Sequence, residues 1–165
     1  HLKLQKFNDV NFVGYGISSF PDLPDQKKVT KIQYKKIKKG HEKLIGLIER
    51  EYYKRDKSKE TIFLTHNIPY KTLDLIINKD SWANKEHYGT KTSRIFCLRH
   101  KPLICIGGHI HEHFGKMKLG KTTVINAGFG AKVNTLLEMK NNKIKQIKFY
   151  PKPYGMGARK KLQYY

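Results

Sequence analysis

Cysteine and long hydrophobic runs are scarce in this sequence of 165 residues. Its two cysteines, Cys97 and Cys105, form no C-x-x-C pair. This spacing is typical of free thiols buried in a reducing compartment and excludes a disulfide framework, so we expect a cytoplasmic protein. No apolar run approaches the roughly 20 residues that a membrane-crossing helix needs. We therefore expect a soluble protein with no membrane partner.

Acidic residues are also few, since 13 Asp and Glu stand against 34 Lys and Arg, which gives a formal net charge of +21. Such an excess attracts polyanions through a field that does not depend on their sequence. A nucleic acid or another phosphate-bearing partner is one interpretation. A lysine bias of the source organism, or adaptation to heat or salt, is the other, and charge alone does not decide between them.

An initiator methionine is missing too, because the sequence begins with His1 and its first methionine is Met117. We therefore expect further residues before His1 in the translated polypeptide. Cleavage of a signal peptide and a cut within a domain explain this start equally well.

Hydrophobic periodicity predicts alternating strands and helices. Apolar or alternating runs predict strands over residues 10–18, 61–66, 102–108 and 122–126, and a hairpin over 136–150 that turns at 141–143. Spacings of three and four predict a helix over 29–53, which Gly40 could divide in two, and shorter helices over 73–77 and 92–100. We expect residues 1–150 to form part of one α/β domain and residues 151–165 to form a basic, aromatic, partly disordered tail.

Polar residues stand where three of the predicted strands end. His66 and Asn67 stand at the end of the strand over 61–66, and His109 and His111 follow the strand over 102–108. Asn126 ends the strand over 122–126. In open α/β folds, sites form where the carboxyl ends of strands converge, so we expect one shared site. Neutral imidazole binds Zn, Mn, Fe, Co and Ni, and two histidines at alternate positions can turn toward one or two ions. The pattern therefore predicts a metal role for His109 and His111.

Other residues of the same loop have less certain roles in the pattern. Gly107 and Gly108 provide backbone without a Cβ, as a loop crowded against metal and phosphate would need. His113, at the third alternate position, either faces outward or binds substrate. The isolated histidines are interpreted as surface or packing residues: His1, His41, His87 and His100.

The segments FLTHNIPYKTLD and KPLICIGGHIHEHFGKMKLGKTTVINAGFG resemble the C-terminal half of the calcineurin-like metallophosphoesterases, and most closely their small phosphodiesterase-like branch. The H-x-x-P, G-H-x-H and Asn-x-Gly segments occur in the family's order, and the likeness covers most of residues 10–150. It implies a four-layer αββα sandwich, here incomplete at its N-terminal side. It also implies two divalent metal ions (Mn, Fe, Zn, Co or Ni, with Mn favoured) and hydrolysis of phosphomono- or phosphodiesters by a metal-activated hydroxide.

Carried over residue by residue, the resemblance implies that His66 and His109 bind one ion and His111 the other. It places Asn67, His113 and Asn126 at the substrate. The family's Asp-x-His, Gly-Asp and Gly-Asn-His motifs, which supply the carboxylates and the general acid, do not occur in these residues. They normally precede this region, so we expect an upstream half or a second chain to supply them. The sequence INAGF replaces the family's Asn-Pro-Gly-Ser, which leaves the substrate open.

Three functions are compatible with this sequence. The first is a metal-dependent phosphoesterase whose substrates include nucleotides or nucleic acids as candidates. The second is a non-catalytic module on the same fold that binds a polyanion or a protein partner. The third is a structural or zinc-storing histidine site, in which removal of the ion unfolds the domain.

Overall fold

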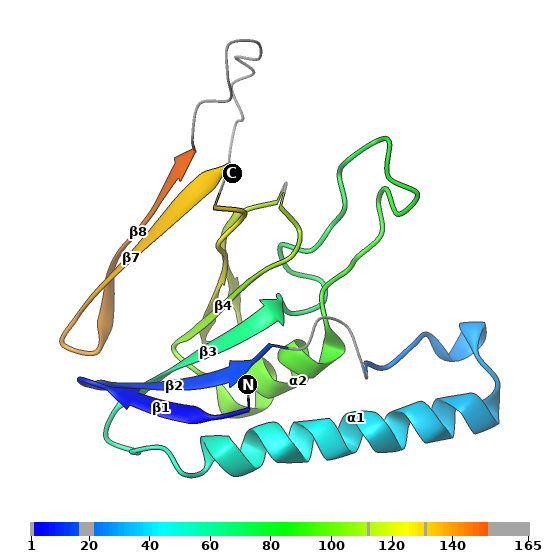
Figure 1. Ribbon diagram of the computed structural model, residues 1–165, viewed down its shortest axis with the longest axis horizontal. Coiled ribbons are helices and arrows are strands. Elements are labelled where there is room, and N and C mark those ends of the chain that lie inside the picture. Colours follow the sequence, from blue (N-terminus) through cyan, green and yellow to red (C-terminus); the bar gives the residue numbers. More distant parts are fainter. Residues whose placement is uncertain (1, 17–21, 112, 131, 152–165) are drawn as a thin grey trace.

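The computed structural model describes residues 2–16, 22–111, 113–130 and 132–151 (Figure 1). Its elements, in chain order, are β1 (Leu4–Phe7), β2 (Val10–Tyr15), a 3-10 turn (Gln26–Lys28), α1 (Lys31–Tyr52), β3 (Glu60–Asn67), α2 (Lys91–His100), β4 (Ile104–Gly108), β5 (Gly115–Leu119), β6 (Thr122–Asn126), β7 (Val133–Lys140) and β8 (Lys143–Pro151). Apart from Pro151, the predicted tail lies outside the described residues.

Six strands form the main sheet, in the order β1-β2-β3-β4-β6-β5. The inner strands β2, β3, β4 and β6 are parallel, and the edge strands β1 and β5 pair antiparallel with their neighbours. Parallel pairing places the carboxyl ends of the four inner strands at one edge of the sheet. This arrangement confirms the predicted α/β class and brings the ends of β3, β4 and β6 together.

The main sheet is covered on both faces, which explains its nearly continuous apolar strands. On one face, Phe63, Cys105 and Val124 pack with residues of α1 and α2 such as Ile48 and Phe96. On the other face, Ile62, Ile104 and Ile125 pack against residues of β7 and β8: Leu137, Met139, Ile144, Ile147 and Phe149. Successive strand residues thus face opposite layers. The described residues form three layers, and a fourth, helical layer beyond the β7–β8 hairpin is not among them (Figure 1).

Helix α1 is continuous, so the prediction that Gly40 divides it is wrong. The helix begins with a capping box, in which the Gln33 backbone N–H donates to Thr30 Oγ1 at 3.2 Å and the Thr30 N–H donates to Gln33 Oε1 at 3.0 Å. A glycine inside a helix costs only about 0.5–1 kcal/mol relative to alanine. Burial of Leu44, Ile48 and other residues on the face of α1 toward the sheet offsets that cost.

The predicted helix over 73–77 is also wrong, because this segment is irregular and Leu75 forms an antiparallel bridge with His87. The carboxylate of Asp74 accepts hydrogen bonds from the backbone N–H groups of Lys71 and Thr72 at 2.9 and 3.0 Å. Local bonds of this kind compete with helical hydrogen bonds. The local side chain therefore overrides a spacing that favours a helix.

Two strands were not predicted, and both lie at the edges of the main sheet. Strands β1 and β5 are short and carry exposed lysines, which blunts a sheet edge against pairing with another chain. The remaining predicted elements are confirmed, including the β7–β8 hairpin, whose turn residues Asn141 and Asn142 have φ values of 52° and 58°. In the predicted strand over 10–18, regular structure ends at Tyr15, and residues 17 and 18 lie outside the described residues.

Both cysteines are free and buried, as predicted from their spacing. Burial strongly raises the pKa of the Cys105 thiol, and its hydrogen bond with Cys97 adds to this effect. The Cys105 thiol is therefore protonated, and both cysteines are packing residues in the core. No helix in the described part of the chain is long and apolar enough to cross a membrane.

Candidate functional site

The site predicted from the sequence lies at the carboxyl edge of the main sheet. In the strand register, Asn67 of β3 pairs with Gly108 of β4, and Gly107 of β4 pairs with Asn126 of β6. His66 lies at the end of β3, and His109 follows β4 directly. His66 and His109, 43 positions apart in the chain, thus meet because neighbouring parallel strands end together.

His66 and His109 are in direct contact at this edge. His66 Nε2 lies 3.1 Å from His109 Nδ1, and the ring centroids are 4.9 Å apart. One of these nitrogens donates a proton and the other accepts it. His109 has a φ of 71°, in the left-handed region, so its ring position depends on an unusual backbone conformation.

The environment of His109 favours its neutral imidazole. Burial lowers the pKa of His109, and the nearby His66 and His111 lower it further. A neutral ring can offer a lone pair to a metal ion, whereas a protonated ring cannot. The electrostatics of the loop thus favour the form of His109 that binds metal.

His111 is exposed, and its ring packs against a different side chain from those of the histidine pair. It stacks on Phe129, with ring centroids 4.7 Å apart and an interplanar angle of 14°. In the described part of the chain, no group of three His, Cys, Asp or Glu side chains has an arrangement that could hold a metal ion. The structure therefore brings two of the three predicted metal ligands together and places the third beside them.

Asn126, predicted to contact substrate, is fully buried and forms hydrogen bonds with the backbone of two loops. Its Nδ2 donates to the carbonyl oxygens of Ile110 and His113 at 2.8 and 2.9 Å, and to that of Leu73 at 3.2 Å. Its Oδ1 accepts the Gly128 N–H at 3.0 Å. Asn126 therefore positions the loop that carries His109 and His111.

The other two predicted substrate contacts, Asn67 and His113, have unsatisfied polar atoms. Asn67 donates through Nδ2 to the Tyr88 carbonyl at 3.2 Å, but its Oδ1 is buried and has no hydrogen-bond partner among the described residues. His113 Nδ1 is likewise buried and has no hydrogen-bond partner among the described residues. Since buried polar atoms are nearly always paired, each of these atoms is available to bind a water, a ligand or a further protein group.

The two glycines before His109 differ in their surroundings. A Cβ on Gly107 would lie 2.9 Å from Ile68 Cγ2 and 3.2 Å from Thr65 Cγ2. Gly107 is therefore needed because β4 approaches the end of β3 closely. Gly108 meets nothing closer than the Gly128 carbonyl oxygen at 3.5 Å, which is ordinary contact.

The role of residues 68–90 was not predicted from the sequence. Within this loop Ile76 and Ala83 are buried with Ile110, and Tyr88 packs against them. Ile110 stands between His109 and His111, so the loop forms a wall of the site. The only feature of the sequence that points to this role is the neighbouring apolar residues within the stretch.

The histidines interpreted as packing residues have varied partners. His41 is buried in the core, and His100 shares the Glu49 carboxylate with Arg99 between α1 and α2. His87 Nδ1 lies 2.7 Å from Asp74 Oδ1 within the loop wall. His1 lies outside the described residues.

A shallow, open depression of ≈ 360 Å³ lies beside His66, at the carboxyl ends of β2 and β3. Its lining residues are Gly14, Tyr15, Gly16, Leu64, Thr65 and His66. The depression therefore adjoins His66 of the histidine pair.

The comparisons with known proteins bear on the fold. No family model matches the chain. The chain is 30% identical over 127 residues to the uncharacterized protein MJ1162 of Methanocaldococcus jannaschii, a match that covers 75% of this chain and 50% of that protein.

Among solved structures, one crystal structure aligns with a TM-score of 0.61 and 14% identity over 92% of this chain and 52% of its own. The crystal structure of TT1561 of Thermus thermophilus aligns with a TM-score of 0.48 and 14% identity, over 92% of this chain and 57% of its own. The chain thus spans about half the length of the proteins it matches. The first structural match supports the α/β fold.

Proposed function

We propose that this chain is part of a metal-dependent phosphoesterase that hydrolyses phosphomono- or phosphodiesters. The observation that carries the proposal is the contact between His66 and His109 at the ends of two neighbouring parallel strands. Residues outside these 165 positions, upstream or in a second chain, complete the site. We propose a cytoplasmic setting, because both thiols are free.

The histidine pair lies within the reach of one divalent ion. Two nitrogens that bind one ion at tetrahedral angles and the distances typical of zinc, about 2.0–2.1 Å, lie about 3.3 Å apart. His66 Nε2 and His109 Nδ1 are 3.1 Å apart as a hydrogen-bonded pair, so an ion would have to replace the shared proton, and both rings would turn toward it. These two residues would hold one ion, preferably Mn, and His111 would bind a second after its ring leaves Phe129. Such ions supply an activated hydroxide and stabilise charge on the phosphate.

The remaining residues of the chain would support this chemistry without taking part in it as acids or bases. Asn126 fixes the histidine loop through its three carbonyl contacts. The unpaired Asn67 Oδ1 and His113 Nδ1 would bind substrate or a completing protein group. Histidines alone lack the negative charge that holds two dications close together, so the completing residues must include carboxylates.

The proposal is tested by hydrolysis of bis(p-nitrophenyl) phosphate and p-nitrophenyl phosphate with Mn²⁺, using the chain joined to its completing residues. His109→Ala should lower kcat/KM by more than about a hundredfold. That is the largest loss typical of a residue that contacts a metal ligand and not the metal itself. His100→Ala, a histidine between the helices, is the matched control. Equal activity of the His109→Ala variant and the parent would contradict the proposal.

The non-catalytic alternative makes a different prediction in the same experiment. A polyanion-binding module shows no hydrolysis in the parent, and its salt-sensitive binding to nucleic acid persists when His66, His109 and His111 are replaced.

A further inference from the structure

The loop over residues 68–90 is a shaped surface beside the candidate site. It leaves the end of β3, rises from the carboxyl edge of the sheet and returns to the start of α2 (Figure 1). Bridges between Pro69 and Thr90 and between Leu75 and His87 join its two arms. The buried Asp74 accepts from His87 and from the Gly89 backbone N–H, at 2.7 and 2.9 Å, and closes the base of the loop.

Trp82 is presented on the outside of this loop. It is the one tryptophan of the sequence, and 89% of its surface is exposed. Its ring meets the edge of Tyr88, with centroids 5.7 Å apart and an interplanar angle of 83°. A tryptophan side chain is a large apolar surface, and tryptophan and tyrosine are enriched at interfaces.

Trp82 is linked to the loop that carries the histidines through a small core. The Tyr88 ring that it contacts packs against the cluster of Ile76, Ala83 and Ile110, and Ile110 is the residue between His109 and His111 in the chain. The loop with Trp82 and the loop with the histidines therefore share this core.

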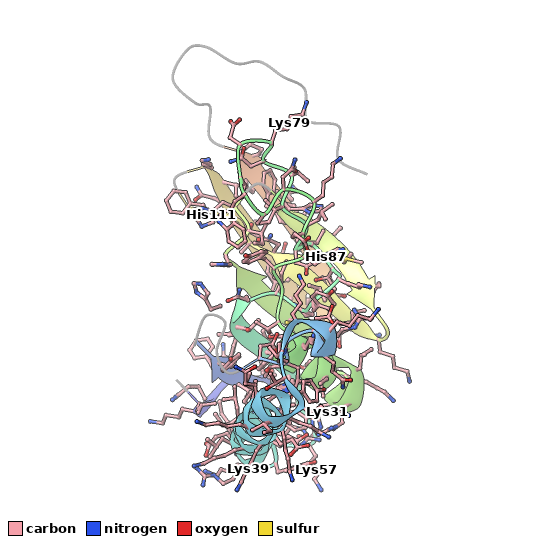
Figure 2. All side chains as sticks on the ribbon, turned by 90° about the vertical axis from the view of Figure 1, so that its right-hand side faces the viewer. Lys31, Lys39, Lys57, Lys79, His87 and His111 are labelled. Atoms are coloured by element: carbon pink, nitrogen blue, oxygen red, sulfur yellow. The ribbon has the colours of Figure 1, made fainter. Side chains whose placement is uncertain are left out.

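The charge around Trp82 favours an anion only modestly. Lys71, Lys79 and Lys85 are exposed in the loop, and Asp80 and Glu86 are exposed among them. Figure 2 shows Lys79 at the end of the molecule opposite Lys31, Lys39 and Lys57. Recognition at the loop must therefore rely on the face of Trp82 more than on local charge.

From this arrangement we propose that the loop binds single-stranded nucleic acid, with a base stacked on Trp82 and the strand running toward His66 and His109. Stacking on an exposed aromatic ring tolerates any base, and nearby lysines follow the phosphates. A second copy of the chain is a poor occupant, because both copies carry a formal charge of +21. The inference rests on the proposed function only for the direction in which the nucleic acid strand runs. It names single-stranded nucleic acid as the substrate class of the proposed phosphoesterase.

Because Trp82 is unique, its own fluorescence reports the binding. The folded chain is titrated without metal with a thymidine oligonucleotide of about ten nucleotides, within the usual site size for such surfaces. We expect saturable quenching of Trp82. In a parallel anisotropy measurement with the labelled oligonucleotide, Trp82→Ala should bind at least about fivefold more weakly, as stacking of about 1 kcal/mol or more requires. Phe7→Ala, an exposed ring on the edge strand β1, is the matched control.

Inorganic polyphosphate, which has charge but no bases, separates stacking from simple attraction. Weak or absent quenching by polyphosphate supports the inference, and quenching equal to that by the oligonucleotide overturns it. Unchanged affinity of Trp82→Ala also overturns it, as does quenching that depends only on protein concentration, which would indicate self-association. Since no metal is present, these binding results do not depend on phosphoesterase activity. Loss of activity in the His109→Ala variant is a separate outcome, which tests the proposed function.

Discussion

Asp74 and Gly89 show how single residues shape the wall of the site. Asp74 is fully buried, and both of its carboxylate oxygens accept hydrogen bonds from the loop. A Cβ on Gly89 would lie 2.7 Å from Asp74 Oδ2 and 2.7 Å from the Ile68 carbonyl oxygen. Only glycine therefore allows the two arms of the loop to approach this closely.

Gly89→Ala should lower the free energy of unfolding by about 1–3 kcal/mol, the usual cost of forcing an extra methyl group into a packed site. Urea unfolding followed by circular dichroism measures the change. Gly46→Ala is the control, since a Cβ there meets nothing within 4 Å and alanine favours the helix α1. A Gly89→Ala variant as stable as the parent would show that the loop shifts at no cost.

His41 makes the stability of the protein depend on pH. It is buried, and its Nε2 lies 3.8 Å from Asp22 Oδ1 without a hydrogen bond among the described residues. Burial lowers the pKa of His41, and Lys91 adds to this, while Asp22 and Glu42 oppose it. A pKa that is lower in the folded state gives stability that is present above the unfolded value of 6.5 and is lost as the pH falls through the folded value.

The free energy of unfolding of the parent should therefore fall between about pH 7.5 and about pH 5.5, and it should fall less in His41→Gln. Urea unfolding of both proteins at each pH gives the comparison. Identical losses in the two proteins would mean that His41 does not carry this dependence.

At the scale of the elements, the start of α1 depends on one side chain. Thr30 and Gln33 form the reciprocal capping box, so two backbone donors are satisfied at an exposed helix end. Thr30→Ala should lower the free energy of unfolding by about 1 kcal/mol. Thr30→Ser keeps the hydroxyl and should be close to the parent in urea unfolding. Equal losses in both variants would argue against the cap.

Buried elements were predicted from the sequence better than exposed or irregular ones. Strands β3, β4 and β6 read as apolar runs because both of their faces are covered. The exposed β1 and β5 give no such signal. The loop around Asp74 depends on hydrogen bonds of one carboxylate with both neighbouring residues and residues 13 and 15 positions away. The sequence indicated that His66 and His109 share an edge, but their contact at 3.1 Å depends on strand register and on the left-handed backbone of His109.

At the scale of the whole molecule, the excess of positive charge acts on folding. Lys31, Lys39 and Lys57 lie at one end and Lys79 at the other (Figure 2), so the charge is spread over the surface. Surface ion pairs such as Lys145 with Glu138 at 2.6 Å offset little of the repulsion. Like charges at this density destabilise the compact state.

Raising NaCl from about 0.02 M to about 0.3 M should therefore raise Tm, because the Debye length shortens and repulsion is screened. Thermal unfolding by circular dichroism measures this. The charge-reversed variant Lys39→Glu with Lys57→Glu should show a smaller rise. A Tm that falls with salt would indicate that attractive ion pairs outweigh the repulsion.

The central claim is that His66 and His109 form one end of a metal site, and calorimetric titration with Mn²⁺ tests it most directly. The chain joined to the residues that complete the site should bind the ion, and the double variant His66→Ala with His109→Ala should bind it at least about tenfold more weakly. His100→Ala should bind as the parent does. If the double variant binds Mn²⁺ as tightly as the parent, the contact between the two histidines is a packing feature and the account of the site is wrong.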